Sequence, residues 1–215
     1  MSQIPVPAGL TEDTLDHTIE ILAKQFEPDA FQRYILLDEM QGSGKTDIGE
    51  EMNKEVFAFI VPDFIKAGAR CMTVPGSGVA SVWTLEEVTE NYTEEPHNPP
   101  AVTELNSLAH HVRKRFIPPQ TTHMLHLVLL ANDRTHPSTS NPAKVSDLIR
   151  PVLDMAREKG WPVVLESTSP RSRDVYTHLG FQLLEEIVVG KGKVDGEGRG
   201  QEGGEGVKLW AMMKC

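Results

Sequence analysis

The second half of the chain alternates apolar runs with amphipathic stretches. Beyond residue 121, short runs rich in Val, Leu and Ile are separated by segments whose apolar residues recur at helical spacing. Strand-like runs separated by helices of about ten residues or more indicate a parallel or mixed sheet with helices on its faces. The predicted elements are a strand at 122–131, a helix at 144–160, a strand at 162–168, a helix at 171–180, and strands at 181–189 and 207–213.

The first half reads mainly as helices followed by a hairpin. Residues 11–25 place Leu15, Ile19 and Leu22 near helical spacing, after a threonine that can cap the helix and with acidic residues in the first turn. Residues 49–69 predict a second, mostly buried helix that Pro62 kinks or splits.

Turn-forming residues organise the middle of the chain. Residues 71–84 form two apolar runs around Pro-Gly-Ser-Gly, which predicts a β-hairpin. The segment 86–120 is polar and predicts a loop at 94–100 and a helix at 105–116. Two neighbouring histidines of that helix, with the Arg-Lys-Arg run after them, are interpreted as a solvated helix face, because adjacent histidines point about 100° apart and are poorly placed to share a metal.

A segment rich in glycine and charge precedes the last strand. Residues 190–206 contain almost no apolar side chain, and such a composition is not expected to bury a core. We expect a long, mobile hairpin loop. At 215 residues the chain is expected to form a single domain, 1–215, with 11–120 as its N-terminal half and 121–215 as its C-terminal half.

Charge and composition restrict the partners. The formal net charge is -10 at pH 7 and no broad basic tract is present, which argues against nucleic acid or an anionic membrane surface as the main partner. No apolar run approaches the ~18 residues of a membrane span, and the first residues do not have the pattern of a signal peptide. With two cysteines only, a disulfide framework is not expected. We expect a cytoplasmic protein that binds a small molecule.

A phosphate-loop motif is nearly present at 41–46, which reads Gln-Gly-Ser-Gly-Lys-Thr. The motif requires a glycine that four residues separate from the final Gly-Lys-Thr, where this chain has Glu39. The preceding segment is short and ends in acidic residues. We therefore expect no nucleotide site here.

Several motifs, in order, resemble those of the GCN5-related N-acetyltransferases. The segment 162–181 is similar to the family pattern of a strand ending in Leu-Glu-Thr-Ser, then Pro-Arg-Asn, then a helix with a tyrosine and a Gly-Phe turn. Residues 148–160, with a proline inside the predicted helix, resemble the helix after the family's coenzyme A loop. Residues 81–84 and 209–213 resemble strands beside the acceptor cleft of puromycin-acetyltransferase-like members. The likeness covers 125–215 well and 30–85 loosely, and 86–120 is unmatched.

The resemblance implies an α/β fold with a mixed, splayed central sheet, and an enzyme that moves an acetyl group from acetyl-CoA to a small-molecule amine. It implies that Tyr176 lies near the sulfur, where a phenol can protonate the leaving thiolate. His126 is close to the place of a catalytic histidine in arylalkylamine-type members, but the partner of that histidine corresponds here to Val128. Tyr176 and His126 can each also be side chains that only pack in the core.

Glu166 ends a predicted strand and can attract an amine or act as a base, or accept backbone hydrogen bonds at the strand end. Trp83, His126 and Glu166 are the candidate substrate contacts. The family bulges a strand near residue 130, so that a backbone N–H can meet the acyl carbonyl, and Asn132 lies in that region. We expect no metal.

The cofactor loop departs from the family pattern. Family members usually have Gln/Arg-x-x-Gly-x-Gly/Ala, which lets backbone N–H groups approach a pyrophosphate. Here 135–145 contains no glycine and has two prolines, and Ser172 replaces the family's asparagine. Side-chain donors, a helix N-terminus and a lysine can still hold an anion. The candidate cofactor residues are Asn132, Ser138, Thr139, Ser140, Asn141, Ala143, Lys144, Val145 and Ser172.

Three functions remain open at this level. The first is acetyl transfer to a small amine. The second is a different reaction on a biosynthetic intermediate, such as a cyclisation, elimination, isomerisation or decarboxylation, by a fold that no longer uses coenzyme A. The third is a non-catalytic binding protein. Fold alone does not decide among them, and the resemblance allows either a monomer or a homodimer.

Overall fold

A computed structural model describes residues 4–37, 48–94, 98–137 and 139–215. The near phosphate-loop motif at 41–46 and the candidate cofactor residue Ser138 lie outside the described residues.

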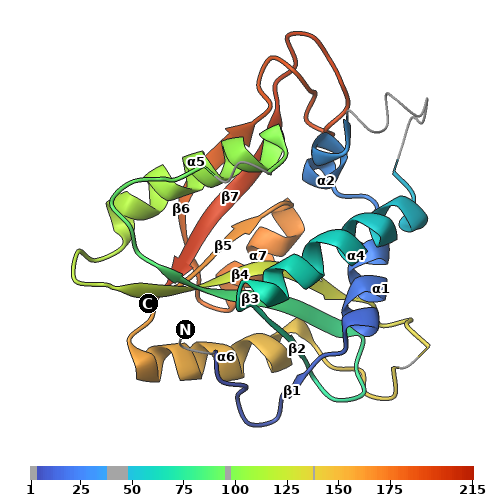
Figure 1. Ribbon diagram of the computed structural model, residues 1–215, viewed down its shortest axis with the longest axis vertical. Coiled ribbons are helices and arrows are strands. Elements are labelled where there is room, and N and C mark those ends of the chain that lie inside the picture. The colour runs from blue at the N-terminus through green and yellow to red at the C-terminus, as the bar shows by residue number, and fades with distance from the viewer. Residues whose placement is uncertain (1–3, 38–47, 95–97, 138) are drawn as a thin grey trace.

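The described residues form one seven-stranded mixed sheet (Figure 1). Its strand order is β1-β2-β3-β4-β5-β7-β6, and only β4 and β5 run parallel. The predicted mixed sheet is confirmed. Its strands are β1 (Thr11–Glu12), β2 (Arg70–Thr73), β3 (Val79–Glu87), β4 (His123–Asn132), β5 (Val163–Ser167), β6 (Gln182–Val189) and β7 (Val207–Lys214).

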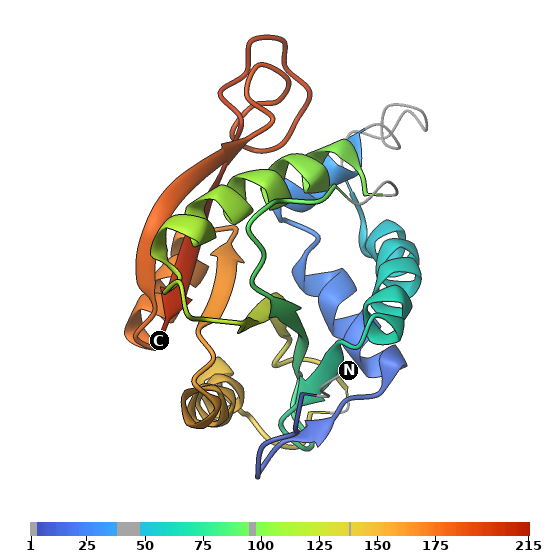
Figure 2. The same ribbon diagram turned by 60° about the vertical axis from the view of Figure 1, so that its left-hand side comes forward.

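Helices cover both faces of the sheet (Figures 1 and 2). One face packs on α6 and α7. On the other face, α1 and α4 cover β2, β3 and β4, while α2 and α5 cover β6 and β7, as the separate apolar clusters on each half show. The helices are α1 (Leu15–Gln25), α2 (Ala30–Ile35), α4 (Glu50–Lys66), α5 (Pro100–Phe116), α6 (Val145–Lys159) and α7 (Pro170–His178).

The sheet splits between β4 and β5. These strands pair only at Leu125 with Val163 and at His126 with Val164. In the pairing of β4 with β3, partners shift between Val82 and Trp83, so that one residue of β4, Val128, is left over. The irregularity expected near residue 130 lies instead at Val128, and residues 129–132 pair regularly with β3. A bulge bends a strand away from its neighbour, so the two halves of the sheet enclose a gap.

Local signals in the first half explain most of the helix boundaries. Thr14 caps α1 through its side chain, which accepts from the N–H of His17. The predicted helix start at residue 11 is therefore too early, because Thr11–Glu12 pairs with β2 as β1. Of the kink or split predicted at Pro62, the split is absent, since α4 runs through Pro62. Phe59 is exposed on a helix expected to be mostly buried. The predicted hairpin is confirmed by β2 and β3.

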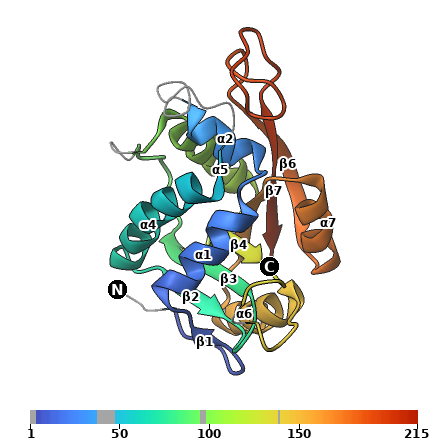
Figure 3. The same cartoon turned by 90° about the vertical axis from the view of Figure 1, so that its right-hand side faces the viewer.

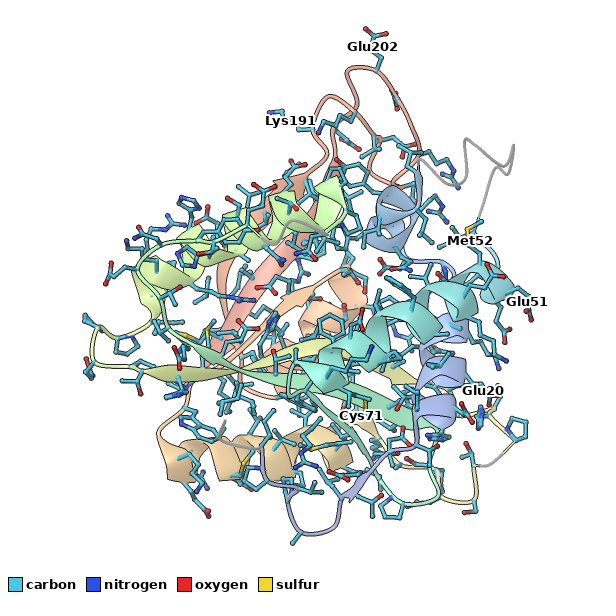
Figure 4. The ribbon with its side chains drawn as sticks, in the orientation of Figure 1. Glu20, Glu51, Met52, Cys71, Lys191 and Glu202 are labelled. Carbon is cyan, nitrogen blue, oxygen red and sulfur yellow. The ribbon has the colours of Figure 1, made fainter. Side chains whose placement is uncertain are left out.

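The glycine-rich segment 190–206 is packed against α2 rather than free of the core. Val194 is completely buried, and Arg33 of α2 donates to the carbonyl oxygen of Glu197 at 2.6 Å. A Cβ at Gly198 would lie 2.0 Å from the carbonyl oxygen of Ala30. The expectation that this segment buries nothing is wrong, since its glycines allow close approach to a helix. Its mobility stays a prediction. In Figures 3 and 4 its far end, with Glu202, extends away from the sheet.

None of the helices in the described ranges is both long enough and apolar enough to cross a membrane.

Candidate active site in the cleft between the two halves of the sheet

A cleft of about 1910 Å³ opens where the two halves of the sheet separate. One wall is the end of β4 and the start of α6, and the facing wall is the end of β5 and α7. The turn between α1 and α2 and the 190–206 segment close the remaining side. All these walls are ends of elements, where backbone groups and side chains are free to meet a ligand.

The cleft has a basic end at α6. Three cationic side chains on this wall form no ion pair with any described residue: Arg134, Lys144 and Arg150. Arg171, on the facing wall, forms none either. The first two N–H groups of α6, on Val145 and Ser146, donate to no described backbone or side-chain acceptor. A helix N-terminus carries about half a positive charge and attracts anions. This end of the cleft is therefore suited to a polyanion, even though Asp147 in the first turn brings one negative charge close by.

Residues 139–143, in the second part of the loop before α6, do not line this end of the cleft. The N–H groups of Ser140 and Asn141 both donate to the carbonyl oxygen of Gly76 at 2.8 Å, and the Asn141 amide reaches Pro75. Ala143 is buried in the core. The cofactor contacts predicted for Thr139, Ser140, Asn141 and Ala143 are therefore not supported, because the longer loop reaches across to the β2–β3 turn.

A glycine in that turn makes the contact possible. A Cβ at Gly78 would lie 1.8 Å from the carbonyl oxygen of Asp133, and the N–H of Asp133 donates to Gly78 at 2.8 Å. No larger residue fits at this position. The loop between β4 and α6 is thus attached to the neighbouring hairpin at both Gly76 and Gly78.

The structure places the other predicted cofactor residues, Asn132, Lys144, Val145 and Ser172, on the cleft wall. Asn132 leaves its buried Oδ1 without a partner among the described residues. Ser172 has no such freedom, since its hydroxyl bonds to the hydroxyls of Ser167 at 2.6 Å and Ser169 at 2.8 Å. Ser172 thus serves the capping of α7, whereas Asn132 has an acceptor to offer.

Tyr176 points its ring into the core of the α6 face and also lines the cleft. The ring packs on Phe181 with centroids 5.7 Å apart. Burial raises the pKa of the phenol above its ordinary value, so the hydroxyl keeps its proton at any physiological pH. Its hydroxyl makes no hydrogen bond to any residue in the described ranges. A protonated phenol on a cleft wall is a proton donor.

Asp29 is a candidate that the sequence reasoning missed. It caps α2 by accepting from the N–H of Gln32 at 2.9 Å and lines the cleft. Its other carboxylate oxygen accepts from the hydroxyl of Thr168, just after β5, at 2.5 Å. Burial raises the pKa of Asp29, against the lowering effect of its hydrogen bonds and of Arg33. The signal was present: an aspartate with Gln32 three residues later is typical of a helix start.

Two exposed acids of the 190–206 segment, Glu197 and Glu205, line the same side of the cleft as Asp29. Neither side chain forms an ion pair with a described residue. Unpaired positive and negative side chains therefore lie at different ends of the cleft, with cations near α6 and carboxylates at α2 and the 190–206 segment. Such an arrangement orients a ligand pair of opposite charge.

His126 and Glu166, each predicted to contact the substrate, contact each other and are not on the cleft wall. His126 Nε2 lies 3.0 Å from Glu166 Oε2, and its Nδ1 lies 2.6 Å from Glu86 Oε1. Arg113 of α5 donates from Nη2 to both Glu166 oxygens at 2.8 Å, and its Nη1 lies 3.4 Å from Glu86. We call Glu86, Arg113, His126 and Glu166 the apex network, because it lies at the closed end of the gap.

With His126 protonated, the apex network holds two positive and two negative charges. Burial opposes the ionisation of Glu166, but Arg113 and His126 lower its pKa to about 2. Burial likewise opposes ionisation of Glu86, whose pKa His126 and Arg113 lower to about 2. Burial and the Arg113 charge disfavour the imidazolium, yet the two carboxylates prevail and raise the pKa of His126. A protonated His126 has no free site for another proton.

The structure corrects the predictions for Trp83 and for the charged face of α5. Trp83 is completely buried in the α6-side core and donates to the Ser81 hydroxyl at 2.9 Å, so it has no surface for a substrate. The helix face expected to be solvated hides one of its cations, because Arg113 has only 11% of its side chain exposed. Its neighbours Lys114 and Arg115 do lie on the exposed side, paired with acids. Sequence spacing alone did not reveal which cation turns inward.

The described residues contain no group of three or more His, Cys, Asp or Glu side chains arranged to hold a metal ion.

Solved structures share this architecture. An insect putative arylalkylamine N-acetyltransferase 7 from the yellow fever mosquito Aedes aegypti aligns at a TM-score of 0.63 and 15% identity, over 95% of this chain and 86% of that one. A polyamine N-acetyltransferase of Drosophila melanogaster aligns at 0.55 and 15% identity, over 95% and 98%. The chain has the fold of the GCN5-related N-acetyltransferases.

A third solved structure with this N-acetyltransferase fold carries a different description. It is the C-terminal condensation domain of Ebony in complex with beta-alanyl-dopamine, at a TM-score of 0.61 and 14% identity, over 95% of this chain and 97% of that one. No family model matches the chain, and neither does any curated protein sequence. At these identities the likeness establishes the fold, and the chemistry rests on the residues of the cleft.

Proposed function

We propose that the chain is an acetyl-CoA-dependent N-acetyltransferase acting on a small-molecule amine. The observation that carries the proposal is the charge arrangement of the cleft, which places unpaired cations and a helix N-terminus at one end and carboxylates at the other. A phosphorylated cofactor and a cationic acceptor are complementary to these two ends. The fold of the chain supports the same activity.

The residues at the basic end fit the cofactor. The N–H groups of Val145 and Ser146 and the side chains of Lys144 and Arg150 would hold its phosphates, in place of the glycine loop used elsewhere in the fold. Asn132, with a buried acceptor that no described residue satisfies, would bond to a donor of the pantetheine arm, which carries amide N–H groups. When bound, acetyl-CoA supplies an acyl thioester.

Two cleft residues would handle the protons of the transfer. Asp29 would accept the proton that the acceptor nitrogen loses as the new N–C bond forms. Tyr176 would donate the phenol proton to the sulfur as the C–S bond breaks. The raised pKa of Asp29 brings that carboxylate closer to the pKa of a useful base. The raised pKa of Tyr176 means that its phenol enters the reaction protonated.

The acidic side of the cleft favours a cationic acceptor. Glu197 and Glu205 would attract an ammonium group and help align it with Asp29. In this assignment Asp29, Glu197 and Glu205 receive the amine. Glu166 and His126, predicted for that role, are instead bonded to each other within the apex network.

The test is an acyl-transfer assay with acetyl-CoA and a panel of arylalkylamines, diamines and guanidinoalkylamines. The release of the coenzyme A thiol measures the rate, and mass spectrometry identifies the acetylated product. We expect turnover with at least one cationic amine and none with its neutral alcohol analogue. Turnover of a substrate in the absence of coenzyme A would contradict the proposal and indicate the second reaction class. Absence of turnover together with recovery of a protein partner would indicate a binding protein.

A further inference from the structure

The apex network joins three strands and a helix at the place where the sheet divides. Thr84, His126 and Val164 form one row across β3, β4 and β5. Glu86 lies two residues along β3 on the closed side of this row, and Glu166 lies two residues along β5 on the open side. By register, Glu166 stands level with Val128, the residue of the bulge, where β4 and β5 no longer pair.

Side chains continue the connection where the backbone pairing stops. His126 of β4 reaches Glu166 of β5 at 3.0 Å across the start of the gap. Arg113, which comes from α5 on the same side of the sheet, touches both side chains, at 3.0 Å from His126 Nε2 and 2.8 Å from each Glu166 oxygen. On the closed side, Glu86 holds His126 Nδ1 at 2.6 Å and also accepts from the Thr84 hydroxyl at 2.8 Å.

Burying four charged side chains costs free energy, so the apex network is not explained by a gain in folding stability. Their side chains are 8% exposed for Glu166, 11% for Arg113, 13% for His126 and 33% for Glu86. Removing charges from water generally costs as much as their pairing returns, and apolar side chains of similar size often stabilise a fold better. Ionic networks specify one geometry because each partner must keep its direction and distance. The position of the apex network at the split between β4 and β5 is therefore more informative about its role than its contribution to folding stability.

We propose that Arg113 and Glu86 are positioning residues, and that the apex network is a clamp that sets the width of the gap between β4 and β5. The cleft walls, at the ends of β4 and β5, continue from this point, so a change of angle at the clamp is carried to the whole cleft. This inference rests on the network geometry and not on the proposed acetyl transfer.

The clamp has a defined response to pH. The charged groups that face His126 are Glu86 from β3, Glu166 from β5 and Arg113 from α5. Loss of the imidazolium proton leaves two carboxylates opposite a single guanidinium, and Glu166 then faces an imidazole that cannot donate to both carboxylates. The clamp is expected to loosen as pH rises through the His126 titration.

The test measures the gap without any ligand. Spin labels on Arg134→Cys, beyond β4, and Arg171→Cys, in α7, span the gap, with exposed Cys215 changed to Ser and buried Cys71 left in place. Pulsed dipolar spectroscopy gives the distance distribution between them. Near pH 6 we expect a narrow distribution in the otherwise unchanged protein. In Arg113→Gln and His126→Gln, a shift or broadening by a sizeable fraction of one strand spacing of ~4.8 Å is expected.

The controls separate the clamp from general damage. Arg115→Gln removes an exposed ion pair from the same helix and should leave the distribution unchanged. If Arg113→Gln does not fold, Glu86→Gln, which alters the least buried member, replaces it. In the unchanged protein the distribution should broaden at alkaline pH, and in His126→Gln this pH dependence should be lost. Identical, pH-independent distributions in folded Glu86→Gln, His126→Gln and Arg115→Gln would overturn the proposal.

Discussion

At the scale of single residues, the cleft separates side chains that are already satisfied from those that are not. Ser172 spends its hydroxyl on Ser167 and Ser169, so its place on the wall contributes little to a ligand. Asn132, with a buried oxygen that no described residue satisfies, has capacity left. Polar atoms that lack a hydrogen-bond partner therefore identify the ligand-binding residues better than a position on the cleft wall does.

Changing Tyr176→Phe tests the proton donor. The ring keeps its packing on Phe181, so the midpoint of thermal unfolding should change little, while kcat should fall by about 10²-fold, the lower range for one acid catalyst. The measurement is steady-state kinetics with acetyl-CoA and the best amine. Thr177→Ala, at an exposed position of α7 that does not line the cleft, is the control and should retain full activity. An unchanged kcat in Tyr176→Phe would remove the phenol from the mechanism.

Changing Asp29→Asn tests the proton acceptor. Asparagine is as good a helix cap as aspartate, so α2 should remain folded while kcat falls by about 10²-fold. In the unchanged protein, activity should rise with pH through the raised pKa of Asp29, because the carboxylate must be ionised to accept a proton. That acidic limb should vanish in Asp29→Asn. Glu202→Gln, at the far end of the 190–206 segment (Figure 4), should behave as the unchanged protein.

At the scale of elements, the regular parts of the fold were readable from the sequence and the irregular parts were not. The apolar run of β4 and the amphipathic run of α6 show their periods directly, so both were predicted within a few residues. The attachment of Ser140 and Asn141 to the β2–β3 turn depends on a contact more than sixty residues away along the chain. No local pattern encodes such a contact.

The same limit applies to the candidate site. Tyr176 was proposed from its motif, and His126 and Glu166 were each proposed as substrate contacts, but their contact with each other was not predicted. Arg113 was assigned to a solvated helix face because its turn of α5 is uniformly charged, and only packing decides which cation turns inward. Asp29 was missed because a helix cap and a catalytic carboxylate have the same sequence signature.

The 190–206 segment offers a test of its docking on α2. Gly198 has a φ of +76°, and a Cβ there would lie 2.0 Å from the carbonyl oxygen of Ala30. Gly198→Ala should therefore lower the free energy of unfolding by about 2–3 kcal/mol, since it adds overpacking to backbone strain. Gly192→Ala is the matched control, with a φ of +83° and no atom within 4 Å of the added Cβ. It should cost only the backbone strain, about 1 kcal/mol.

Urea unfolding at fixed pH measures both variants. Equal losses in Gly198→Ala and Gly192→Ala would show that the segment is not packed against α2 in solution.

At the scale of the whole molecule, the apex network predicts how stability depends on pH. The folded-state pKa values of Glu86 and Glu166 are lowered from 4.5 to about 2. Their contribution is therefore present above pH 4.5 and is lost as pH falls toward about 2. The folded-state pKa of His126 is raised above 6.5, so its contribution is complete below pH 6.5 and is lost as pH rises through the folded-state value.

We therefore expect a maximum in the free energy of unfolding between about pH 4.5 and 6.5 from these groups, measured by urea unfolding from pH 4 to 9. His126→Gln should flatten the alkaline side of the curve relative to the unchanged protein. If both proteins lose stability in parallel between pH 6.5 and 9, the imidazolium is not part of the folded network.

The cleft, finally, combines contributions from both halves of the sheet, since its basic end belongs to β4, α6 and α7 and its acidic end to α2 and the 190–206 segment (Figure 1). The central claim is that this cleft binds acetyl-CoA without a glycine loop. Isothermal titration calorimetry with acetyl-CoA tests it most directly, with Lys144→Ala and Arg150→Ala as variants. Lys191→Ala, which removes an exposed cation that does not line the cleft, is the control.

We predict a Kd at or below ~100 μM, or about −5.5 kcal/mol, unchanged in Lys191→Ala. In each cleft variant, loss of a charge-assisted contact worth about 1.5 kcal/mol should weaken binding about tenfold. No heat of binding at millimolar acetyl-CoA, or equal affinity in all four proteins, would contradict the account.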